Sequence, residues 1–249
     1  MRLQNKIAIV TGAASGFGAE IARTFVTEGA RVVIADINES AARDLASELG
    51  DLAMGLKCDV SSATEVSELV SQTCTLFGDP DIIVNNAGIT HKNGPMLDVD
   101  EDTFDWIFNV NVKAIFHMSK AVIPIMRRRR SGVILNVGSV AGIRPRPGLT
   151  WYNASKGAVN VLSKSMAAEL GPDNIRVNAI CPVLGVTGLL EAFMGAPDTP
   201  ENRARFLATI PLGRLAEGRD VANAALFLAS DEADFITGLE MPVDGGRSV

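Results

Sequence analysis

Cysteine, histidine, tryptophan and tyrosine are scarce in this sequence, with three, two, two and one copies among 249 residues. The cysteines, Cys58, Cys74 and Cys181, include no CxxC pair and are too few and too scattered for a disulfide framework. His91 and His117 have no metal-ligand spacing to one another or to the cysteines. We therefore expect a reduced chain that holds no metal.

The chain also lacks long apolar runs and an excess of basic charge. Its longest segment without an acidic or basic residue, Val177–Leu190, is interrupted by Pro182 and is too short to span a bilayer. Only Ile7–Val10 is apolar near the N-terminus, which is too little for a signal peptide. With 23 basic and 29 acidic side chains, the net charge of −6 argues against a general nucleic-acid binder. These absences predict a cytoplasmic protein with neither membrane nor nucleic acid as partner.

Short β-branched runs alternate with longer segments of helical period along the whole chain. The runs are nearly continuous in apolar residues, which is typical of parallel strands covered on both faces. No linker or repeat divides the chain, so the alternation predicts a single α/β domain over residues 1–249. Its core would be a doubly wound parallel sheet of about seven strands flanked by helices. The expected strands are Ile7–Val10, Arg31–Ala35, Ala53–Cys58, Ile82–Val84, Gly132–Val137, Ile175–Ile180 and Glu240–Val243.

One segment, residues 185–212, departs from this regularity. It is rich in glycine and proline and has a short helical pattern only around Glu201–Thr209. A long irregular insertion after the carboxyl end of a strand is often a lid over a binding site. We expect a substrate lid here, with an ordinary surface connection as the alternative.

A glycine-rich turn, Thr11–Gly18, joins the first expected strand to a helix that starts near Ala19. Glycine allows a tight turn and a close approach of the backbone to a pyrophosphate, and the helix N-terminus offers free N–H groups. The position of the turn between the first strand and the first helix makes the signal specific. It predicts a dinucleotide site that includes Gly12, Ser15, Gly16, Phe17 and Gly18.

Asp36 stands at the end of the second expected strand, eighteen residues beyond Gly18. A carboxylate there can accept hydrogen bonds from a ribose 2′-hydroxyl but repels a 2′-phosphate. Ile37 follows in place of an arginine, and the glycine turn contains no basic residue. These residues predict NAD as the cofactor, in preference to NADP. The alternative is that Asp36 only caps a helix or a turn.

Tyr152 and Lys156 are four residues apart at the start of a helical run that continues to Leu170, so they share one helix face. The pKa of a tyrosine is about 10 in water, which is high for a base at neutral pH. A neighbouring ammonium favours the phenolate and lowers this pKa. Since Tyr152 is the only tyrosine in the chain, no other phenol competes for this role.

Three further residues are candidates for contact with a substrate. Leu149 and Trp151 precede the tyrosine and could line a pocket, although an aromatic residue there could equally serve packing. His91 follows the sequence Asn-Asn-Ala-Gly-Ile-Thr and is a weaker candidate. The arginine run Arg127–Arg130 ends a helix, where it fits a solvated face or a docking patch for an acidic carrier protein.

Taken together, these motifs resemble those of the short-chain dehydrogenase/reductase family. The residues that carry the resemblance are Thr11–Gly18, Asn85-Asn86-Ala87-Gly88, Ser139 and the Tyr152/Lys156 pair, and the match runs from Lys6 to Val243-Asp244-Gly245-Gly246. The resemblance implies a Rossmann-like fold and hydride transfer to or from a nicotinamide cofactor.

The resemblance also implies roles for four catalytic residues. Tyr152 would be the general acid and base, and Lys156 would hold the nicotinamide ribose and lower the pKa of the tyrosine. Ser139 would hydrogen-bond the substrate oxygen. Asn111 is similar to the family's asparagine that kinks a helix and anchors a water of the proton relay.

The remaining roles implied by the resemblance concern the cofactor. Asp59 and Val60 would meet the adenine, and Asn86, Ala87 and Gly88 would line the adenosine side of the cleft. Thr187, behind Pro182, would bond the carboxamide. This sequence departs from the family in one place, because Val183 stands where a glycine usual in the family would follow the proline. Gly185 is the candidate to restore the flexibility.

These features predict an NAD-dependent oxidoreductase acting on a small secondary alcohol, polyol or sugar, or on the matching ketone. The alternative is a 3-oxoacyl-[acyl-carrier-protein] reductase, against which Asp36 counts because such reductases usually take NADPH. A remoter alternative, a non-catalytic NAD-binding regulator, has no need of all four catalytic residues. The resemblance further implies a homo-oligomer, a dimer or tetramer, paired through the helices that carry Asn111 and Tyr152.

Overall fold

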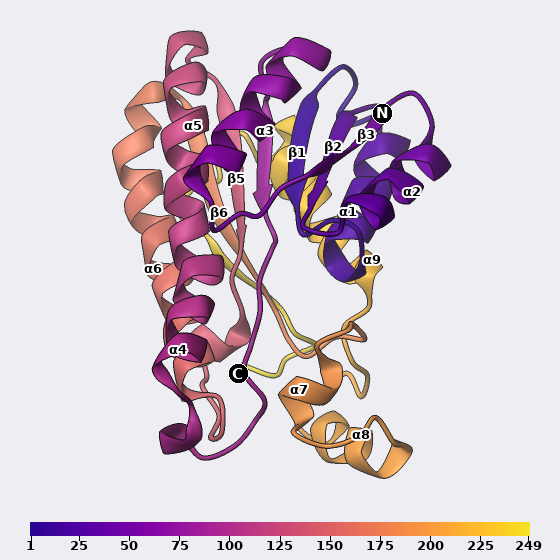
Figure 1. The fold of residues 1–249 in the computed structure, drawn as a ribbon, viewed down its shortest axis with the longest axis vertical. Helices are drawn as coiled ribbons and strands as arrows, with labels where there is room; N and C mark the ends of the chain where they lie inside the picture. The colour runs from indigo at the N-terminus through magenta and orange to yellow at the C-terminus, as the bar shows by residue number, and fades with distance from the viewer.

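The computed structural model describes residues 1–249 and contains one parallel sheet of seven strands between two layers of helices (Figure 1). The strand order is β3-β2-β1-β4-β5-β6-β7. The prediction of a Rossmann-like, doubly wound sheet is therefore confirmed. All seven expected strands are present: β1 Ile7–Thr11, β2 Arg31–Asp36, β3 Ala53–Lys57, β4 Ile82–Asn85, β5 Gly132–Val137, β6 Ile175–Pro182 and β7 Glu240–Val243.

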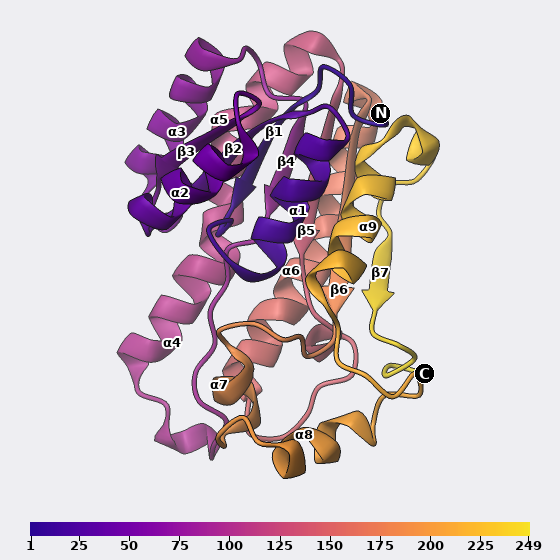
Figure 2. The ribbon, with the colours of Figure 1, turned by 90° about the vertical axis from the view of Figure 1, so that its right-hand side faces the viewer.

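Helices cover both faces of the sheet, which explains why its strands carry apolar residues in succession. Side chains alternate between the two faces along a strand. In β1, Val10 packs in the layer of α1, α2 and α9, whereas Ile9 packs in the layer of α3, α5 and α6. Figure 2 shows the first of these layers from its outer side. The bounds are α1 Gly16–Thr27, α2 Glu39–Leu49, α3 Ala63–Leu76, α5 Ala114–Arg129, α6 Thr150–Leu170 and α9 Gly218–Ala229.

The sheet reverses its direction of winding between β1 and β4. Ile9 of β1 lies in register with Val33 of β2 on one side and with Ile83 of β4 on the other. The loops that leave the carboxyl ends of β1 and β4 therefore diverge toward opposite layers. In doubly wound sheets, ligands bind in the crevice that this divergence creates.

A wide helical turn joins α4, Glu101–Phe108, to α5. Residues Asn109–Lys113 form a single π-helical turn, a feature that often marks a functional site. The turn directs Asn111 inward, where its Nδ2 donates to the carbonyl of Ile89 at 3.0 Å and to Oγ of Ser155 at 2.9 Å. The amide N–H of Ile89 donates in return to Oδ1 of Asn111 at 2.9 Å.

The segment 185–212 lies beyond the carboxyl ends of the strands, away from the main core (Figure 2). It contains α7, Leu190–Met194, which was not predicted, and α8, Pro200–Leu207, which confirms the helical pattern expected near 201–209. Leu190, Met194 and Ile210 form a small apolar cluster of their own with Leu215. Its role as a lid stays a prediction.

Short 3-10 turns complete the chain at Met96–Asp98, Val140–Gly142, Gly171–Asp173 and Asp231–Ala233. None of the helices combines the length and the apolar character that crossing a bilayer requires.

Candidate active site

The glycine turn packs against the segment that follows β4 so closely that side chains cannot fit between them. A Cβ on Gly12, whose φ is +60°, would lie 2.7 Å from the Cα of Ala87. A Cβ on Gly18 would lie 2.5 Å from the carbonyl oxygen of Gly12 and would overlap Nδ2 of Asn86. The two glycines are therefore required by steric fit, as the motif predicts.

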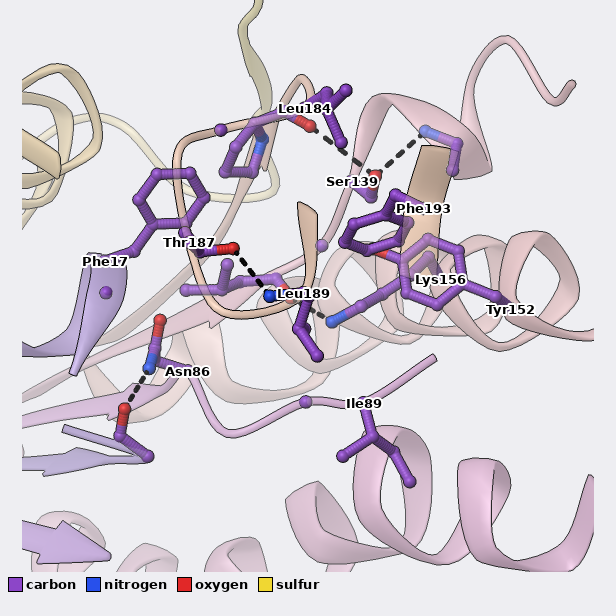
Figure 3. A pocket seen from close by; sticks show the side chains of 18 of the residues that line it. Phe17, Asn86, Ile89, Ser139, Tyr152, Lys156, Leu184, Thr187, Leu189 and Phe193 are labelled. Carbon is purple, nitrogen blue, oxygen red and sulfur yellow. Dashed lines mark hydrogen bonds between the residues drawn. The ribbon is translucent and has the colours of Figure 1, made fainter. Parts of the chain in front are cut away.

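Asn86 and Thr11 hold this packing together with hydrogen bonds. Nδ2 of Asn86 donates to the carbonyls of Thr11 and Gly12, at 2.8 and 2.9 Å, and one of these two bonds is drawn in Figure 3. The main-chain N–H groups of Asn86 and Ala87 donate to Oγ1 of Thr11, both at 3.1 Å. The result is a fixed cradle at the carboxyl ends of β1 and β4.

Asp36 is held beside this cradle at the end of β2. Its carboxylate accepts from the N–H of Ala14, in the glycine turn, and from the N–H of Asn38, both at 3.0 Å. Asp36 therefore does act within a turn, as the alternative interpretation has it, but it also faces the cleft with Ile37, Asp59 and Val60. Ile37, which follows Asp36 in place of a basic residue, is 65% exposed.

A single cavity of about 700 Å³ runs from the cradle to α7 and α8. Every residue predicted to bind the cofactor lines it except Gly18, which lies beneath the turn against Asn86. Of the predicted catalytic and substrate residues, four line it: Ser139, Leu149, Tyr152 and Lys156. Asn111 lies behind the cavity wall, since a Cβ on Gly88 would lie 3.3 Å from its Oδ1 and 3.2 Å from Nζ of Lys156.

The phenol and the serine come together where β5 ends and α6 begins. Tyr152 is buried, and the ring of Phe193 from α7 meets it edge-on with ring centres 5.0 Å apart (Figure 3). Oγ of Ser139 accepts from the N–H of Ala141 at 3.0 Å, so its proton points toward another acceptor. The carbonyl of Pro182, at 3.5 Å, offers only a long contact.

Burial dominates the ionisation of the tyrosine–lysine pair. It raises the pKa of Tyr152 to about 12, although neighbouring Ser139 and the Arg146 charge oppose the rise. Burial also lowers the pKa of Lys156 to about 8. Nζ of Lys156 donates to the carbonyl of Val137 at 2.8 Å. The net pKa of the phenol therefore lies above its ordinary value, because loss of solvent outweighs the opposing effects of Ser139 and of the Arg146 charge. That the Lys156 ammonium lowers this pKa stays a prediction.

Trp151 and His91 do not line the cavity, contrary to the sequence prediction. Nε1 of Trp151 donates to the carbonyl of Met96 at 3.0 Å, and its ring meets Phe104 edge-on at 5.4 Å. Neighbouring residues of an α-helix point about 100° apart, so Trp151 turns away when Tyr152 faces the cleft. His91 is buried with Nδ1 2.9 Å from the carbonyl of Lys92. No group of three or more His, Cys, Asp or Glu side chains is arranged to hold a metal ion.

Val183, at the position where the family usually has glycine, is accommodated without distortion of the strand end. Its N–H donates to the carbonyl of Val243 at 3.2 Å, which extends the pairing of β6 with β7. Two residues later, Gly185 passes so near Phe17 that a Cβ would lie 2.7 Å from the ring atom Cε1. Gly185 thus supplies the close approach beside the glycine turn.

Sequence reasoning missed four arginines that line the cavity, Arg144, Arg146, Arg205 and Arg247. They come from three segments, with Arg144 and Arg146 in one of them, and form no run, so no local pattern marks them. The run that did attract notice is engaged elsewhere: Arg127 pairs with Asp173 at 2.6 Å, Arg129 pairs with Asp81, and Arg130 donates to the carbonyl of Pro172.

The cavity joins the glycine cradle at the switch point of the sheet to a buried phenol at its other end. This arrangement is that of an α/β enzyme that binds a dinucleotide. Comparison with known proteins gives the family. The protein-family model described as "Enoyl-(Acyl carrier protein) reductase" matches residues 12–248 of this chain. The chain belongs to the short-chain dehydrogenase/reductase family, as its motifs predicted, and it is an oxidoreductase of that family.

Several relatives match over nearly their whole length. The chain is 46% identical to 4-formylbenzenesulfonate dehydrogenase of Comamonas testosteroni, with all of both chains covered. It is 41% identical to a 3-oxoacyl-[acyl-carrier-protein] reductase of Haemophilus influenzae, with 98% of each covered. A crystal structure of 3-ketoacyl-(acyl-carrier-protein) reductase from Brucella melitensis, complexed with NADH, has a TM-score of 0.94 and 43% identity, covering 99% of this chain and 100% of that one.

Proposed function

We propose that the protein is an NAD-dependent oxidoreductase that interconverts a small secondary alcohol, polyol or sugar with its ketone. One observation carries the proposal: Tyr152 and Ser139 line the same cavity as the glycine turn and Asp36. A phenol and a hydroxyl at the substrate end can hold one oxygen, while the cradle holds a dinucleotide. Dehydrogenases and reductases among the relatives support this chemistry.

The residues of the cradle fit a nicotinamide dinucleotide. Because a Cβ on Gly12 or Gly18 would overlap neighbouring atoms, the backbone is free to approach a pyrophosphate closely. The Ser15 side chain does not cap α1, so the first N–H groups of that helix stay available to the phosphates. When bound, the nicotinamide would accept hydride from an alcohol carbon or return it to a carbonyl carbon. We assign the ribose to Asp36, the adenine to Asp59 and Val60, and the carboxamide to Thr187.

The protein's own part is to hold the substrate oxygen and to move its proton. Ser139 would donate a hydrogen bond to that oxygen, and Tyr152 would take the hydroxyl proton during oxidation and return it during reduction. Lys156, with a pKa of about 8, can exchange a proton near neutral pH. Asn111 and Lys156 flank one point beside Gly88, so we propose that a water there continues the relay.

Asp36 supports NAD as the preferred cofactor. Two main-chain N–H groups fix its carboxylate, so it cannot swing away to admit a 2′-phosphate without losing both bonds. Specificity constants with NAD⁺ and NADP⁺ test this preference. We expect the Asp36→Asn substitution to lower the ratio of kcat/KM with NAD⁺ to kcat/KM with NADP⁺ by about tenfold, since it removes the repulsion between the carboxylate and the 2′-phosphate. An equal use of both cofactors by the natural protein would contradict it.

A 3-oxoacyl-[acyl-carrier-protein] reductase is the second candidate, because two relatives described as such reductases are 41% and 43% identical over 98% and 99% of the chain. The Brucella reductase was crystallised with NADH, so a preference for NAD does not by itself separate the candidates. The deciding experiment compares alcohols, ketones and aldehydes with an acetoacetyl thioester, each with both cofactors. Aldehydes belong in the panel because the Comamonas relative is named for one. Strong reduction of the thioester with NADPH would replace our first proposal by the second.

We further propose that residues 185–212 form a lid on the single domain.

We also propose that the chain assembles into dimers or tetramers through α5 and α6. An apolar groove between these helices, lined by Phe116, Ile123, Leu162 and Met166, supports the assembly. Phe116 is 59% exposed in the single chain. A mass near 26.3 kDa by light scattering would contradict it.

A further inference from the structure

The two ends of the cavity carry opposite charge. The carboxylates that line it, Asp36 and Asp59, belong to the nucleotide end. The cations apart from Lys156 are four arginines, Arg144, Arg146, Arg205 and Arg247. None of these arginines forms an ion pair with an aspartate or glutamate side chain. The cavity thus contains arginines that no aspartate or glutamate side chain of the chain neutralises.

Arg146 lies beside the reacting end of this cavity. One of its terminal nitrogens donates to the carbonyl of Phe193 at 2.9 Å, and the ring of that same residue meets Tyr152. Its guanidinium carbon stands 4.9 Å from the centre of the Phe206 ring. The guanidinium is therefore held by the main chain of Phe193 and lies over the ring of Phe206, and its charge opposes the rise in the pKa of the phenol.

The fixed guanidinium keeps most of its hydrogen-bonding capacity free. An arginine has five N–H donors in a planar fork, and Arg146 uses one terminal nitrogen in a hydrogen bond to the protein. Burial lowers the pKa of Arg146, as does the charge of nearby Arg247. A half-buried cation without a counter-ion is unfavourable unless an anion pairs with it.

The other three arginines contribute to different degrees. Arg205, exposed on α8, makes no side-chain hydrogen bond within the chain and adds positive charge at the rim. Arg144 is engaged by the main-chain carbonyls of Arg247 and Val249. The side chain of Arg247, which also lines the cavity, likewise forms no hydrogen bond or ion pair within the chain. Arg146, Arg205 and Arg247 are therefore the cations available to a ligand, and Arg146 is the one whose charge acts on the phenol.

We infer that the substrate carries an anionic group, a sulfonate or a carboxylate, on an aromatic or other apolar body, and that Arg146 binds this group. The inference rests on the proposed function and refines its substrate class. Leu149, Leu189, Phe193 and Phe206 supply the apolar wall for the body of such a molecule. The planar fork of Arg146 suits two oxygens of one anionic group. The cofactor's own phosphates would lie at the glycine turn and leave Arg146 free.

The reaction leaves the anionic group unchanged. The alcohol carbon would lose hydride to the nicotinamide, the hydroxyl proton would pass to Tyr152, and a carbonyl would form. Arg146 acts through binding alone, so its contribution should appear as discrimination between charged and neutral substrates.

The first experiment measures that discrimination. We expect the natural protein with NAD⁺ to use the secondary alcohols 4-(1-hydroxyethyl)benzenesulfonate or 4-(1-hydroxyethyl)benzoate with a kcat/KM at least tenfold above that for 1-phenylethanol. The Arg146→Gln variant should lower the ratio of anionic to neutral kcat/KM by roughly 100-fold, as expected for loss of one partner of a desolvated charge pair. Arg146→Lys should restore part of the ratio, because it keeps the charge and loses the fork. The two anions tell which oxyanion the site prefers.

Arg203→Gln is the matched control, since it removes a guanidinium of α8 that pairs with Asp198 and does not line the cavity. The ratio should be unchanged in this variant. An unchanged ratio in Arg146→Gln would overturn the inference, whatever the absolute rates.

A binding measurement separates this inference from the proposed function. Calorimetry with benzenesulfonate, with and without NADH, should detect binding to the natural protein and at least tenfold weaker binding to Arg146→Gln. Absence of binding to the natural protein would also overturn the inference. If no alcohol yields NADH while benzenesulfonate still binds through Arg146, the proposed function fails and the anion site stands.

Discussion

The two ends of the cleft are built by different means. The nucleotide end is made of main chain, with Gly12 and Gly18 leaving no room for side chains and Asn86 bonding to carbonyls. The substrate end is made of side chains, among them Arg146, Phe193 and Phe206, from segments distant in the sequence. At the nucleotide end, close packing of the main chain requires glycine at fixed positions in the sequence. At the substrate end, only the final shape of the pocket matters, so many different sequences could provide it.

The two ends of the cleft also differ in the charge of the ligand that each would accept. In the functions proposed above, Asp36 at the nucleotide end would disfavour an additional phosphate, whereas the arginines at the substrate end would favour an anion. One cavity therefore combines two opposite electrostatic preferences about the reacting carbon. Substitutions at each end should accordingly affect different measurements.

Tyr152→Phe should produce the largest effect, because the phenol is the group that connects the two ends. We expect kcat to fall by at least about 10³-fold, since no other tyrosine can transfer the proton. NADH binding, followed by fluorescence, should remain within about threefold of the natural protein. Near-normal turnover would remove Tyr152 from the mechanism.

Gly18→Ala should damage the nucleotide end selectively. The added Cβ would overlap Asn86 and lie 2.5 Å from the carbonyl of Gly12, so the cradle must shift. We expect NADH affinity to fall by about 100-fold, which corresponds to about 2.7 kcal/mol. Gly171→Ala is the control, because nothing lies within 4 Å of its Cβ position. Equal NADH affinities in the two variants would show that the close packing has no role.

Lys156→Met should make the protein more stable at neutral pH while it loses activity. Burial lowers the pKa of Lys156 from 10.5 to about 8, so holding its charge in the folded state at pH 7 costs about 3 kcal/mol. The lost hydrogen bond to Val137 offsets about 1 kcal/mol of the gain. We expect the free energy of unfolding to rise by about 2 kcal/mol.

The stability gained in Lys156→Met should depend on pH. Between pH 8 and 10.5 the unfolded chain binds the lysine proton and the folded chain does not, so the natural protein gains stability as pH rises. The advantage of the methionine variant should therefore vanish by about pH 9.5. Urea denaturation at pH 7 and 9.5 measures both values, and a constant advantage would contradict the assigned cause.

Trp151→Phe should have the smallest effect on catalysis. The variant loses the hydrogen bond to Met96 and keeps an aromatic ring beside Phe104, so stability should fall by about 1 kcal/mol. We expect kcat/KM to stay within about twofold. Leu149→Ala, at a buried position that lines the cavity, should instead raise KM. A tenfold rise of KM in Trp151→Phe would show instead that Trp151 lines the substrate pocket, as the sequence predicted.

The fold could be predicted because its strands are covered on both faces and so read as short apolar runs. The errors in the strands are confined to their ends, as at β6, which continues to Pro182 because Ala179–Pro182 pairs with β7, and one short helix, α7, was not predicted. The nucleotide end was equally predictable, since steric exclusion at Gly12 and Gly18 leaves a mark in the sequence itself.

The substrate end could be predicted only in part. The spacing of Tyr152 and Lys156 placed both on one helix face, but local spacing does not report the loss of solvent that sets their pKa values. Trp151 was misplaced because the rotation of α6 about its axis was unknown. Arg146 gave no signal, because an arginine in a polar loop acquires its meaning only when Phe193 and Phe206 meet it.

The π-helical turn at Asn109–Lys113 ties the length of the chain to its chemistry. An α-helix advances about 100° per residue, so removal of one residue here would rotate the whole of α5 relative to α4. Met118, Val122 and Met126 would then leave the interior, and the amide of Asn111 would no longer meet Ile89 and Ser155. A one-residue deletion in this turn would be tolerated by neither the core nor the relay, so both depend on the same count of residues.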